Sequence, residues 1–530
     1  MRKNEMKSKS WFAILAAIVI IVIVLLVVRD HSNKYPAGIK NALKKAGENR
    51  NELVKVIEHY VEQGDSLKLK AAYYLVENME GHSYVIYGLH DSNKVDIEFD
   101  VLAYPDYKSL LKALDEIKAE HGSLDFSKDE IKQDLKNISA NLLIDNIDMA
   151  FRAWQEKAWA KHLSFENFCE YVLPYRGSNE PLEEWRPHFG EQFKDLDKKM
   201  ENPEDPIEAT RLINNDIKSW FSFDPRYYYH PTDQGLSEML KNKLGRCEDM
   251  TNLAIYAMRA NGLAVTSDYT PHWADTGNNH AWNAILDRDG KVIMFMGGES
   301  NPGDYKLHNR MAKVYRKTYS VQKQNLVFQK PEWEKVPRWL SRKNYKDVTS
   351  DYTDVSDVTI ALKQPVPDSV NYAYLCVFND GEWKAIHWGK IAEQKVTFTD
   401  MGRNIAYLPM YYAKEKLIPA ASAFILEKSG AMRKLLPDEE NTAKIKLLST
   451  TRRKLLISTD GIAKASFEPG KNYELFYWKD GWVSLVKKAA SDKPLTFNEV
   501  PAGALYWLVA QDSRRDERIF TIEDGMQVWW

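Results

Sequence analysis

The middle of the chain changes from helical spacing of apolar residues to strand-like alternation within a few residues. Five apolar residues recur on one helical face: Met250, Leu253, Ala254, Ala257 and Met258. Asn261-Gly262 then supplies a typical helix C-terminus. Three strand-like runs follow: 264–269, 280–283 and 292–296. Asp287-Arg288-Asp289-Gly290 joins the last two as a hairpin turn, so this region predicts a helix followed by antiparallel strands.

The preceding residues, from about Tyr35 to Met200, carry mostly helical patterns. Apolar positions repeat at helical spacing in 53–61 and again in 142–154, with lysine and glutamate on the other faces. The run Val95–Phe99 alternates instead and predicts either a strand insertion or an extended loop. Two prolines among acidic residues in 201–206 mark a domain boundary.

After Tyr352 the pattern is wholly β and contains an internal repeat of about 100 residues. The run from Tyr374 to Trp383 is matched by the run from Tyr473 to Trp482, with an Asp-Gly turn in both. We expect two tandem β-sandwiches. Their aromatic residues form core and cross-strand pairs or, alternatively, a platform for carbohydrate or peptide.

The N-terminus carries an apolar run of 18 residues, Trp11–Val28. As a helix it would be about 27 Å long, close to the hydrocarbon thickness of a bilayer. Basic residues precede it, which predicts a cytoplasmic N-terminus, a single-pass anchor and an extracytoplasmic, periplasmic remainder. A cleaved signal peptide is the alternative, although the run continues into Arg29 without a typical cleavage site. No cysteine lies nearby for a lipid anchor.

Charge and cysteine content narrow the function classes. Lysine plus arginine number 73 against 75 for aspartate plus glutamate, so the overall charge gives no reason to expect a nucleic-acid partner. Three cysteines cannot form a disulfide framework. Cys169, in a helical run, and Cys376, in a strand-like run, are expected to be small buried apolar residues.

Cys247 is different because it opens the predicted helix. Unpaired backbone N–H groups and the helix dipole favour a thiolate at this position. Glu248 and Asp249 oppose the thiolate, and Arg246 offsets part of that effect. His280 begins a strand 33 residues later. The pair predicts a thiol nucleophile with a histidine base.

A metal site built from Cys247, His272 and His280 is the competing interpretation of these residues. Structural zinc takes four ligands, commonly with close Cys-x-x-Cys or His-x-x-x-His spacing, and these three residues lack that spacing. We therefore expect no metal and no cofactor.

The sequence Gly-Arg-Cys247, followed by His280-Ala281-Trp282-Asn283 on a strand, resembles the transglutaminase-like superfamily over roughly residues 207–305. The resemblance is greater to bacterial, extracytoplasmic, Bacteroidetes-type members, and it extends to the peptide N-glycanase branch. It implies a papain-like α+β core that attacks carboxamides through a Cys-His-Asp triad and forms a thioester. Peptides, proteins or glycopeptides would be the substrates.

With this resemblance the expected domains are as follows: a cytoplasmic tail and transmembrane anchor (1–30), a helical N-terminal domain (31–206), a transglutaminase-like catalytic domain (207–345) and two β-sandwich repeats (346–437 and 438–530). The fold class is α+β. Carbohydrate binding through the β-sandwiches is an additional expectation.

The third member of the triad departs from the family pattern. The family's aspartate lies on the strand after the histidine hairpin, where this chain has Met294-Phe295-Met296. Glu299, after two glycines, is the nearest acid that could orient His280. Asp287 belongs to the hairpin turn, and Asn283 lies on the opposite strand face from His280. The expected oxyanion donors or substrate-binding residues are the backbone N–H of Cys247 and the side chains of Gln234, Trp220 and Trp282.

Two functions therefore remain open. In the first, the chain is a thiol amidase, peptidase or acyl transferase that acts through Cys247 and His280. In the second, suggested by the missing aspartate, the same fold is a catalytically degenerate binding or assembly module.

Overall fold

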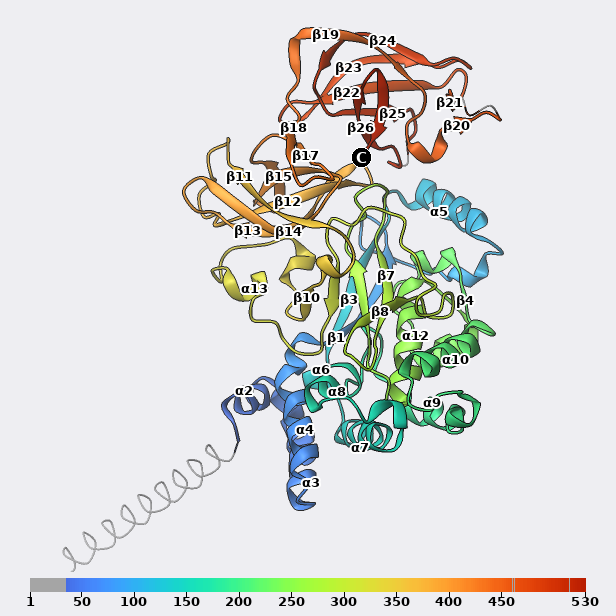
Figure 1. Cartoon of the computed structure of the whole chain (residues 1–530), viewed down its shortest axis with the longest axis vertical. Helices are drawn as coiled ribbons and strands as arrows, with labels where there is room; N and C mark the ends of the chain where they lie inside the picture. The colour runs from blue at the N-terminus through green and yellow to red at the C-terminus, as the bar shows by residue number, and fades with distance from the viewer. Residues whose placement is uncertain (1–34, 460, 462, 514) are drawn as a thin grey trace, which may run out of the picture.

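The computed structural model describes residues 35–459, 461, 463–513 and 515–530. The apolar run Trp11–Val28 lies outside these residues. Within the described part of the chain, no helix has both the length and the apolar character needed to span a membrane. Helices dominate the first half and antiparallel strands the second, so the mixed α and β class is confirmed (Figure 1).

The N-terminal helices pack around one apolar cluster. They are α2 (Ala37–Lys45), α3 (Arg50–Glu62), α4 (Ser66–Asn78), α7 (Ala140–Glu156) and α8 (Phe165–Tyr171). In α7, Leu143, Ile147, Ala150 and Phe151 recur at helical spacing and are all buried. The hydroxyl of Ser139 accepts a hydrogen bond from the Leu142 N–H and caps this helix.

A small sheet is inserted among these helices, and one of its strands, Asp96–Ile97, lies within the run Val95–Phe99 that the sequence pattern predicted to be a strand insertion or an extended loop. Three antiparallel strands lie in the order β2-β1-β3: β1 (Ser83–His90), β2 (Asp96–Ile97) and β3 (Asp125–Gln133). Helix α5 (Tyr107–His121) separates β3 from the first two. Strand β3 is mostly exposed and charged, and it therefore lacks the apolar alternation that would have revealed it.

The central region places one helix against a five-stranded antiparallel sheet of order β10-β9-β6-β7-β8. The strands are β6 (Val265–Thr270), β7 (His280–Leu286), β8 (Val292–Phe295), β9 (Tyr315–Lys317) and β10 (Tyr345–Asp347). Helix α12 (Cys247–Ala260) is buried continuously from Asp249 to Ala260. It packs against β6, β7 and the helices α9 (Arg186–Gln192) and α10 (Pro206–Lys218). The predicted helix and the three predicted strands are all present.

The C-terminal part repeats one strand arrangement twice. In the first repeat (355–434), β11 (Val355–Ala361) pairs with β14 (Lys395–Gly402), and a sheet runs β13-β12-β15-β17-β18: Glu382–Lys390, Tyr372–Asn379, Ile405–Ala413, Phe424–Leu426 and Met432–Lys434. In the second repeat (438–529), β19 (Asp438–Leu447) pairs with β24 (Leu495–Ala502), and a sheet runs β23-β22-β25-β26-β27: Trp482–Ala489, Asn472–Trp478, Tyr506–Ala510, Ile519–Glu523 and Met526–Trp529.

Shorter elements complete the described chain. They are α6 (Asp134–Asn137), α11 (Leu236–Asn242), α13 (Leu326–Gln329), β4 (Ser222–Phe223), β5 (Leu244–Gly245), β16 (Lys416–Pro419), β20 (Leu456–Ile457) and β21 (Ala463–Lys464). Strands β4 and β5 pair in parallel, and β5 lies directly before α12.

Aromatic side chains fill the junction between the two repeats. Phe378 contacts Trp482 and Trp507, and Trp383 contacts Trp478, with ring centroids 5.2–5.8 Å apart. Trp383 and Trp478 are 8% and 6% exposed. These rings therefore belong to an interior junction rather than an exposed platform for sugars. Figure 1 shows the C-terminus at the same junction.

Both repeats also hold the loop 271–279, which leads into His280. The Nδ2 group of Asn379 donates to the carbonyls of Trp273, Thr276 and Asn278 at 2.9–3.0 Å. From the second repeat, the Arg518 guanidinium donates to the carbonyl of Ala274 at 2.5 Å. The chain leading to His280 is thus fixed from outside the central region.

Candidate functional site

A cavity of about 890 Å³ lies between the N-terminal part and the central sheet. Cys247 and His280 both line it. Its other walls come from the N-terminal part, which contributes His82 and Lys128, and from the segment before β10, which contributes Arg342. The two residues predicted to form the nucleophilic pair therefore share one cavity.

Cys247 is the first residue of α12, as its sequence position predicts. The Asp249 carboxylate accepts hydrogen bonds from the backbone N–H groups of Arg246, at 2.9 Å, and Gln234, at 3.0 Å. These bonds hold the helix start in place. The backbone N–H of Ala281, the residue after His280, donates to the Cys247 sulfur. This contact brings the thiol to the first residues of β7.

The charge state of this thiol differs from the sequence expectation. Burial raises the pKa of Cys247 to about 11, and the neighbouring Glu248 carboxylate acts in the same direction. The Ala281 N–H and Arg246 lower the pKa, but they do not outweigh burial. At neutral pH the resting group is a thiol, because tertiary packing removes solvent that the sequence pattern could not reveal.

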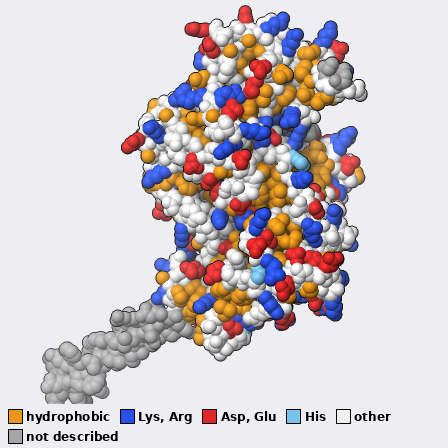
Figure 2. Space-filling view, in the orientation of Figure 1, with side chains coloured by type: hydrophobic (Ala, Val, Ile, Leu, Met, Phe, Trp, Pro, Cys, Tyr) orange, Lys and Arg blue, Asp and Glu red, His pale blue; other side chains and the backbone are white. Residues whose placement is uncertain are grey.

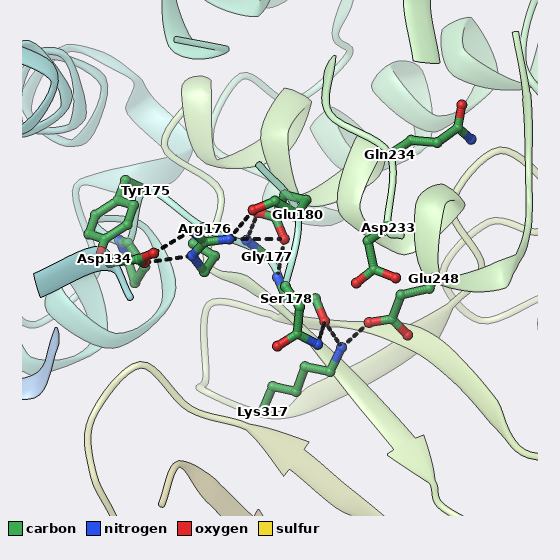
Figure 3. Close-up of polar contacts among 12 residues, drawn as sticks. Asp134, Tyr175, Arg176, Gly177, Ser178, Glu180, Asp233, Gln234, Glu248 and Lys317 are labelled. Carbon is green, nitrogen blue, oxygen red and sulfur yellow. Dashed lines mark hydrogen bonds and ion pairs between the residues drawn. The ribbon is translucent and has the colours of Figure 1, made fainter. Parts of the chain in front are cut away.

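Glu248 belongs to a polar network that joins the helix start to the N-terminal part. Its carboxylate pairs with Lys317 of β9, and the Lys317 ammonium also donates to the Ser178 hydroxyl at 2.7 Å (Figure 3). Burial alone would raise the pKa of Glu248, but the Lys317 charge holds it at about 2. Glu248 is therefore a fixed negative charge beside Cys247.

The same network secures the loop that carries Ser178. Arg176 is buried and pairs with Asp134 at 2.6 Å. The Glu180 carboxylate accepts the backbone N–H groups of Gly177, at 2.6 Å, and Ser178, at 2.7 Å. A loop from the N-terminal part is thereby held against the start of α12.

His280 begins β7, and its imidazole contacts a tyrosine rather than a carboxylate. The Nε2 atom lies 2.5 Å from the Tyr305 hydroxyl. The ring also stacks with Trp273, with centroids 5.9 Å apart at 28°. Burial lowers the pKa of His280 to about 4, although the Glu248 charge favours the protonated form. The resting imidazole is neutral at pH 7.

Glu299 lies in the turn that follows β8, at an exposed position. Its backbone N–H donates to the Met296 carbonyl at 3.1 Å. Its charge acts on Tyr305, whose pKa is raised first by burial and then by Glu299. The structure thus places Tyr305 at the imidazole and Glu299 within electrostatic range of Tyr305.

The other three predicted residues do not line the cavity. Gln234 is fully buried, and its Nε2 group donates to the Leu244 carbonyl; Figure 3 shows its side chain directed away from Glu248. The Trp220 indole donates to Asp216 at 3.3 Å. Trp282 is 0% exposed, and its indole donates to the Tyr352 hydroxyl at 3.1 Å. Each of these three side chains is already engaged within the fold.

Two further residues take structural positions. The Asp287 carboxylate accepts the backbone N–H groups of Asp289 and Lys291 and so shapes the hairpin turn. The Asn283 side chain bonds the Thr251 carbonyl and the Gly297 N–H. It therefore links β7 to α12 and to the glycines after β8.

His272 also lines the cavity, and burial lowers its pKa to about 4. Across the described residues, no three or more His, Cys, Asp or Glu side chains are grouped in a way that could hold a metal ion.

Comparison with known proteins identifies the central region. The sequence model of the transglutaminase-like superfamily matches residues 194–294, a span that contains both Cys247 and His280. The chain carries a transglutaminase-like domain. The match begins before, and ends earlier than, the span 207–305 expected from the motifs. Tyr305 and Glu299 lie beyond its end.

One solved structure similar to this chain is that of red sea bream transglutaminase. The identity is 10%, the alignment covers 84% of this chain and 76% of that chain, and the TM-score is 0.20. A likeness this low supports no structural argument. A search of curated proteins gives no match.

Three features around the transglutaminase-like domain could not be predicted from the sequence pattern. Tyr305 follows Asn301-Pro302-Gly303-Asp304, a turn-rich run with no periodicity. Lys317 is on a strand of three residues. The wall from the N-terminal part depends on β3, which the sequence pattern did not reveal.

Proposed function

We propose that this protein is a membrane-anchored, extracytoplasmic cysteine hydrolase or acyl transferase. It would act on amide bonds of peptides, proteins or glycopeptides through a thioester on Cys247. The observation that carries the proposal is the shared cavity of Cys247, at the N-terminus of α12, and His280, at the start of β7. The match to the transglutaminase-like superfamily supports the reaction class.

The proposed reaction begins with transfer of the thiol proton from Cys247 to His280 as the sulfur attacks the amide carbon. The backbone N–H of Cys247, unpaired at the start of α12, would donate to the developing oxyanion. His280 then returns the proton to the leaving nitrogen as the C–N bond breaks, which leaves a thioester. Water or an amine releases the acyl group and restores the thiol.

Tyr305 would be the positioning residue for His280. When Nε2–H donates to the Tyr305 oxygen, Nδ1 is unprotonated and is free to accept the thiol proton. A phenol is uncharged at neutral pH, so it stabilises the imidazolium less than an aspartate would. Glu299 would add negative charge behind Tyr305 and so recover part of that stabilisation.

The proposed architecture is a papain-like core preceded by the N-terminal part and followed by two β-sandwiches. The domain limits at 30, 206, 345 and 437, and the membrane anchor in the first of these segments, stay predictions. The proposed function includes this anchor, which would put the cavity outside the cytoplasmic membrane.

The test is to detect the acyl-enzyme directly. The purified full chain, in detergent, is incubated with a mixture of glutamine- and asparagine-containing peptides, and acylated tryptic fragments are sought by mass spectrometry. Acylation of the Cys247 fragment, with release of ammonia or amine, is expected. Cys169→Ala, at another buried cysteine, is the matched control and should retain the signal. Ammonia release that persists in Cys247→Ala would refute the proposal.

The second candidate is a binding module without catalysis. It is favoured by the raised pKa of Cys247 and the lowered pKa of His280, since both oppose a resting thiolate–imidazolium pair. Peptides that bind equally to the unaltered chain and to Cys247→Ala, with no acylated fragment in either, would establish this alternative.

A further inference from the structure

The cavity carries a surplus of positive charge, although the whole chain is nearly neutral. Eight lysines and arginines line it, against three acids, Glu80, Asp233 and Glu248. Over the face drawn in Figure 2, side chains of both signs are interspersed. Because the whole chain has a formal net charge of -2, the surplus is local to the cavity.

Each of the three lining acids is already paired. Glu80 pairs with Lys343, Asp233 with Arg246, and Glu248 with Lys317. Two more of the eight cations are satisfied otherwise: Arg176 pairs with Asp134, and Arg259 donates to backbone carbonyls. Five of the eight cations are thus satisfied within the fold, and three are left.

The three remaining cations are Lys128, on β3, and Arg338 and Arg342, in the segment before β10. Among the described residues, none of the three has a carboxylate partner. The Arg338 guanidinium donates to the Tyr87 hydroxyl at 3.0 Å, and Arg342 bonds the Tyr269 hydroxyl. Both partners are neutral, so the positive charges stay uncompensated.

These three cations lie close enough to repel one another. The pKa of Lys128 is lowered first by burial and then by the charges of Arg338 and Arg342. Like charges held together without counter-ions favour binding of an anion, because its charge relieves the repulsion. We call Lys128, Arg338 and Arg342 the basic wall.

We propose that the basic wall binds carboxylates of the substrate, so that the preferred acyl donor is a peptide or protein segment with acidic residues near the reacting amide. This inference rests on the proposed function for the reacting amide. All three residues of the basic wall lie outside the span 194–294 that matches the superfamily. The side chains would position an acidic segment along the cavity that leads to Cys247.

The experiment measures binding without turnover. The full-length Cys247→Ala variant, in detergent, is titrated with short fluorescein-labelled peptides that contain one glutamine flanked by glutamates, by lysines or by phosphoserines. Fluorescence anisotropy at low and high salt gives the affinities. The glutamate peptide should bind about tenfold or more tightly than the lysine peptide at low salt, and this preference should shrink at high salt.

Charge-removing variants locate the effect. The triple variant Lys128→Gln/Arg338→Gln/Arg342→Gln should lose about tenfold or more of the affinity for the glutamate peptide. Arg342→Gln alone should lose part of it. Lys346→Gln is the matched control, since Lys346 is an exposed cation four residues further on that does not line the cavity. It should leave the affinity unchanged.

The outcomes separate this inference from the proposed function. Equal binding of the glutamate and lysine peptides, binding of neither, or an unchanged affinity in the triple variant would overturn the basic wall. A preference for the phosphoserine peptide that the triple variant abolishes would keep the anion site and identify phosphate as its ligand. Because Cys247→Ala has no nucleophile, charge-selective binding would stand even if the thiol proved unreactive.

Discussion

The two β repeats share a strand order, yet they meet the transglutaminase-like domain in different ways. In the first repeat, the β12–β13 turn reaches the loop 271–279: Asn379 is 1% exposed, and its Nδ2 group lies within hydrogen-bonding distance of three carbonyls of that loop. In the second repeat, a Cβ atom added at Gly481 of the equivalent turn would meet no atom within 4 Å, and Lys479 pairs with Glu439 in an exposed position. In the second repeat, the contact with the loop 271–279 is made instead by Arg518, the residue immediately before β26. A repeated fold therefore does not imply a repeated role.

Because Arg518 makes this contact for the second repeat, we expect the largest effect on stability from its substitution. It is buried and donates to the carbonyls of Phe378, Ala274 and Trp530. Arg518→Met would leave these acceptors unpaired, and we expect a loss of about 3 kcal/mol or more in unfolding free energy. Scanning calorimetry would show a lower melting temperature. Arg515→Met, at an exposed arginine paired with Glu382, should shift it little.

Asn379→Ala tests the first repeat. Loss of the Nδ2 donor that serves the carbonyls of Trp273, Thr276 and Asn278 should cost about 2–3 kcal/mol in unfolding free energy. It should also slow acylation of Cys247, because Trp273, whose carbonyl Asn379 holds, stacks on His280. The readouts are thermal unfolding and the acylation rate. Lys479→Ala is the equivalent change in the second repeat; an equal loss there would contradict the distinction between the repeats.

The loop 271–279 leads into His280, and the burial of this histidine makes the stability of the fold depend on pH. His280 is buried and neutral, with its pKa lowered to about 4 from an ordinary value near 6.5. Between these values the unfolded chain binds more protons than the folded chain, so stability falls as the pH drops from about 6.5 to 4.

We expect His280 to account for about 2 kcal/mol of the loss in unfolding free energy. This figure is discounted because the imidazole lines the cavity, where solvent screens its charge. Melting temperatures of the unaltered chain and of His280→Asn should therefore converge or cross as the pH falls through this window. His188→Asn, at an exposed histidine, is the control. Parallel curves for the unaltered chain and His280→Asn would disprove the assignment.

The smallest expected effect comes from two glycines, Gly277 in the loop that the β12–β13 turn contacts and Gly481 in the β22–β23 turn. A Cβ atom at Gly277 would lie 1.9 Å from the Asp380 carboxylate oxygen, whereas one at Gly481 would meet nothing within 4 Å. Gly277→Ala should destabilise by about 1 kcal/mol as Asp380 moves away. Gly481→Ala should be neutral or stabilise by about 0.5 kcal/mol. Calorimetry of both variants would reveal whether the β12–β13 turn packs against the loop 271–279 while the β22–β23 turn stays open.

Sequence reasoning succeeded where local periodicity and tertiary position agree. Helix α12, strands β6–β8 and the hairpin between β7 and β8 follow directly from apolar spacing and turn residues. The positions of Cys247 at a helix start and of His280 at a strand start are as the sequence predicted, whereas their catalytic roles stay a prediction. The Asp-Gly turns likewise revealed the two repeats.

The features that escaped prediction depend on contacts between distant segments. The pKa of Cys247 rises because parts of the chain far from it in sequence bury the start of α12. Tyr305 reaches His280 from an irregular loop. Strand β3 pairs with β1 across about 40 intervening residues, and its exposed charges give no apolar pattern. No local signal encodes any of these.

The origin of the basic wall has an evolutionary consequence. Lys128 lies in a sheet inserted between helices of the N-terminal part, whereas Cys247 lies at the start of a helix packed on nearly every side. A change at Lys128 therefore alters the cavity without disturbing the core around Cys247. Under the proposed function, selection on the inserted sheet would change which substrates are accepted while the chemistry at Cys247 stays the same. Among related chains with the same cysteine and histidine, this sheet is where we expect specificity to diverge.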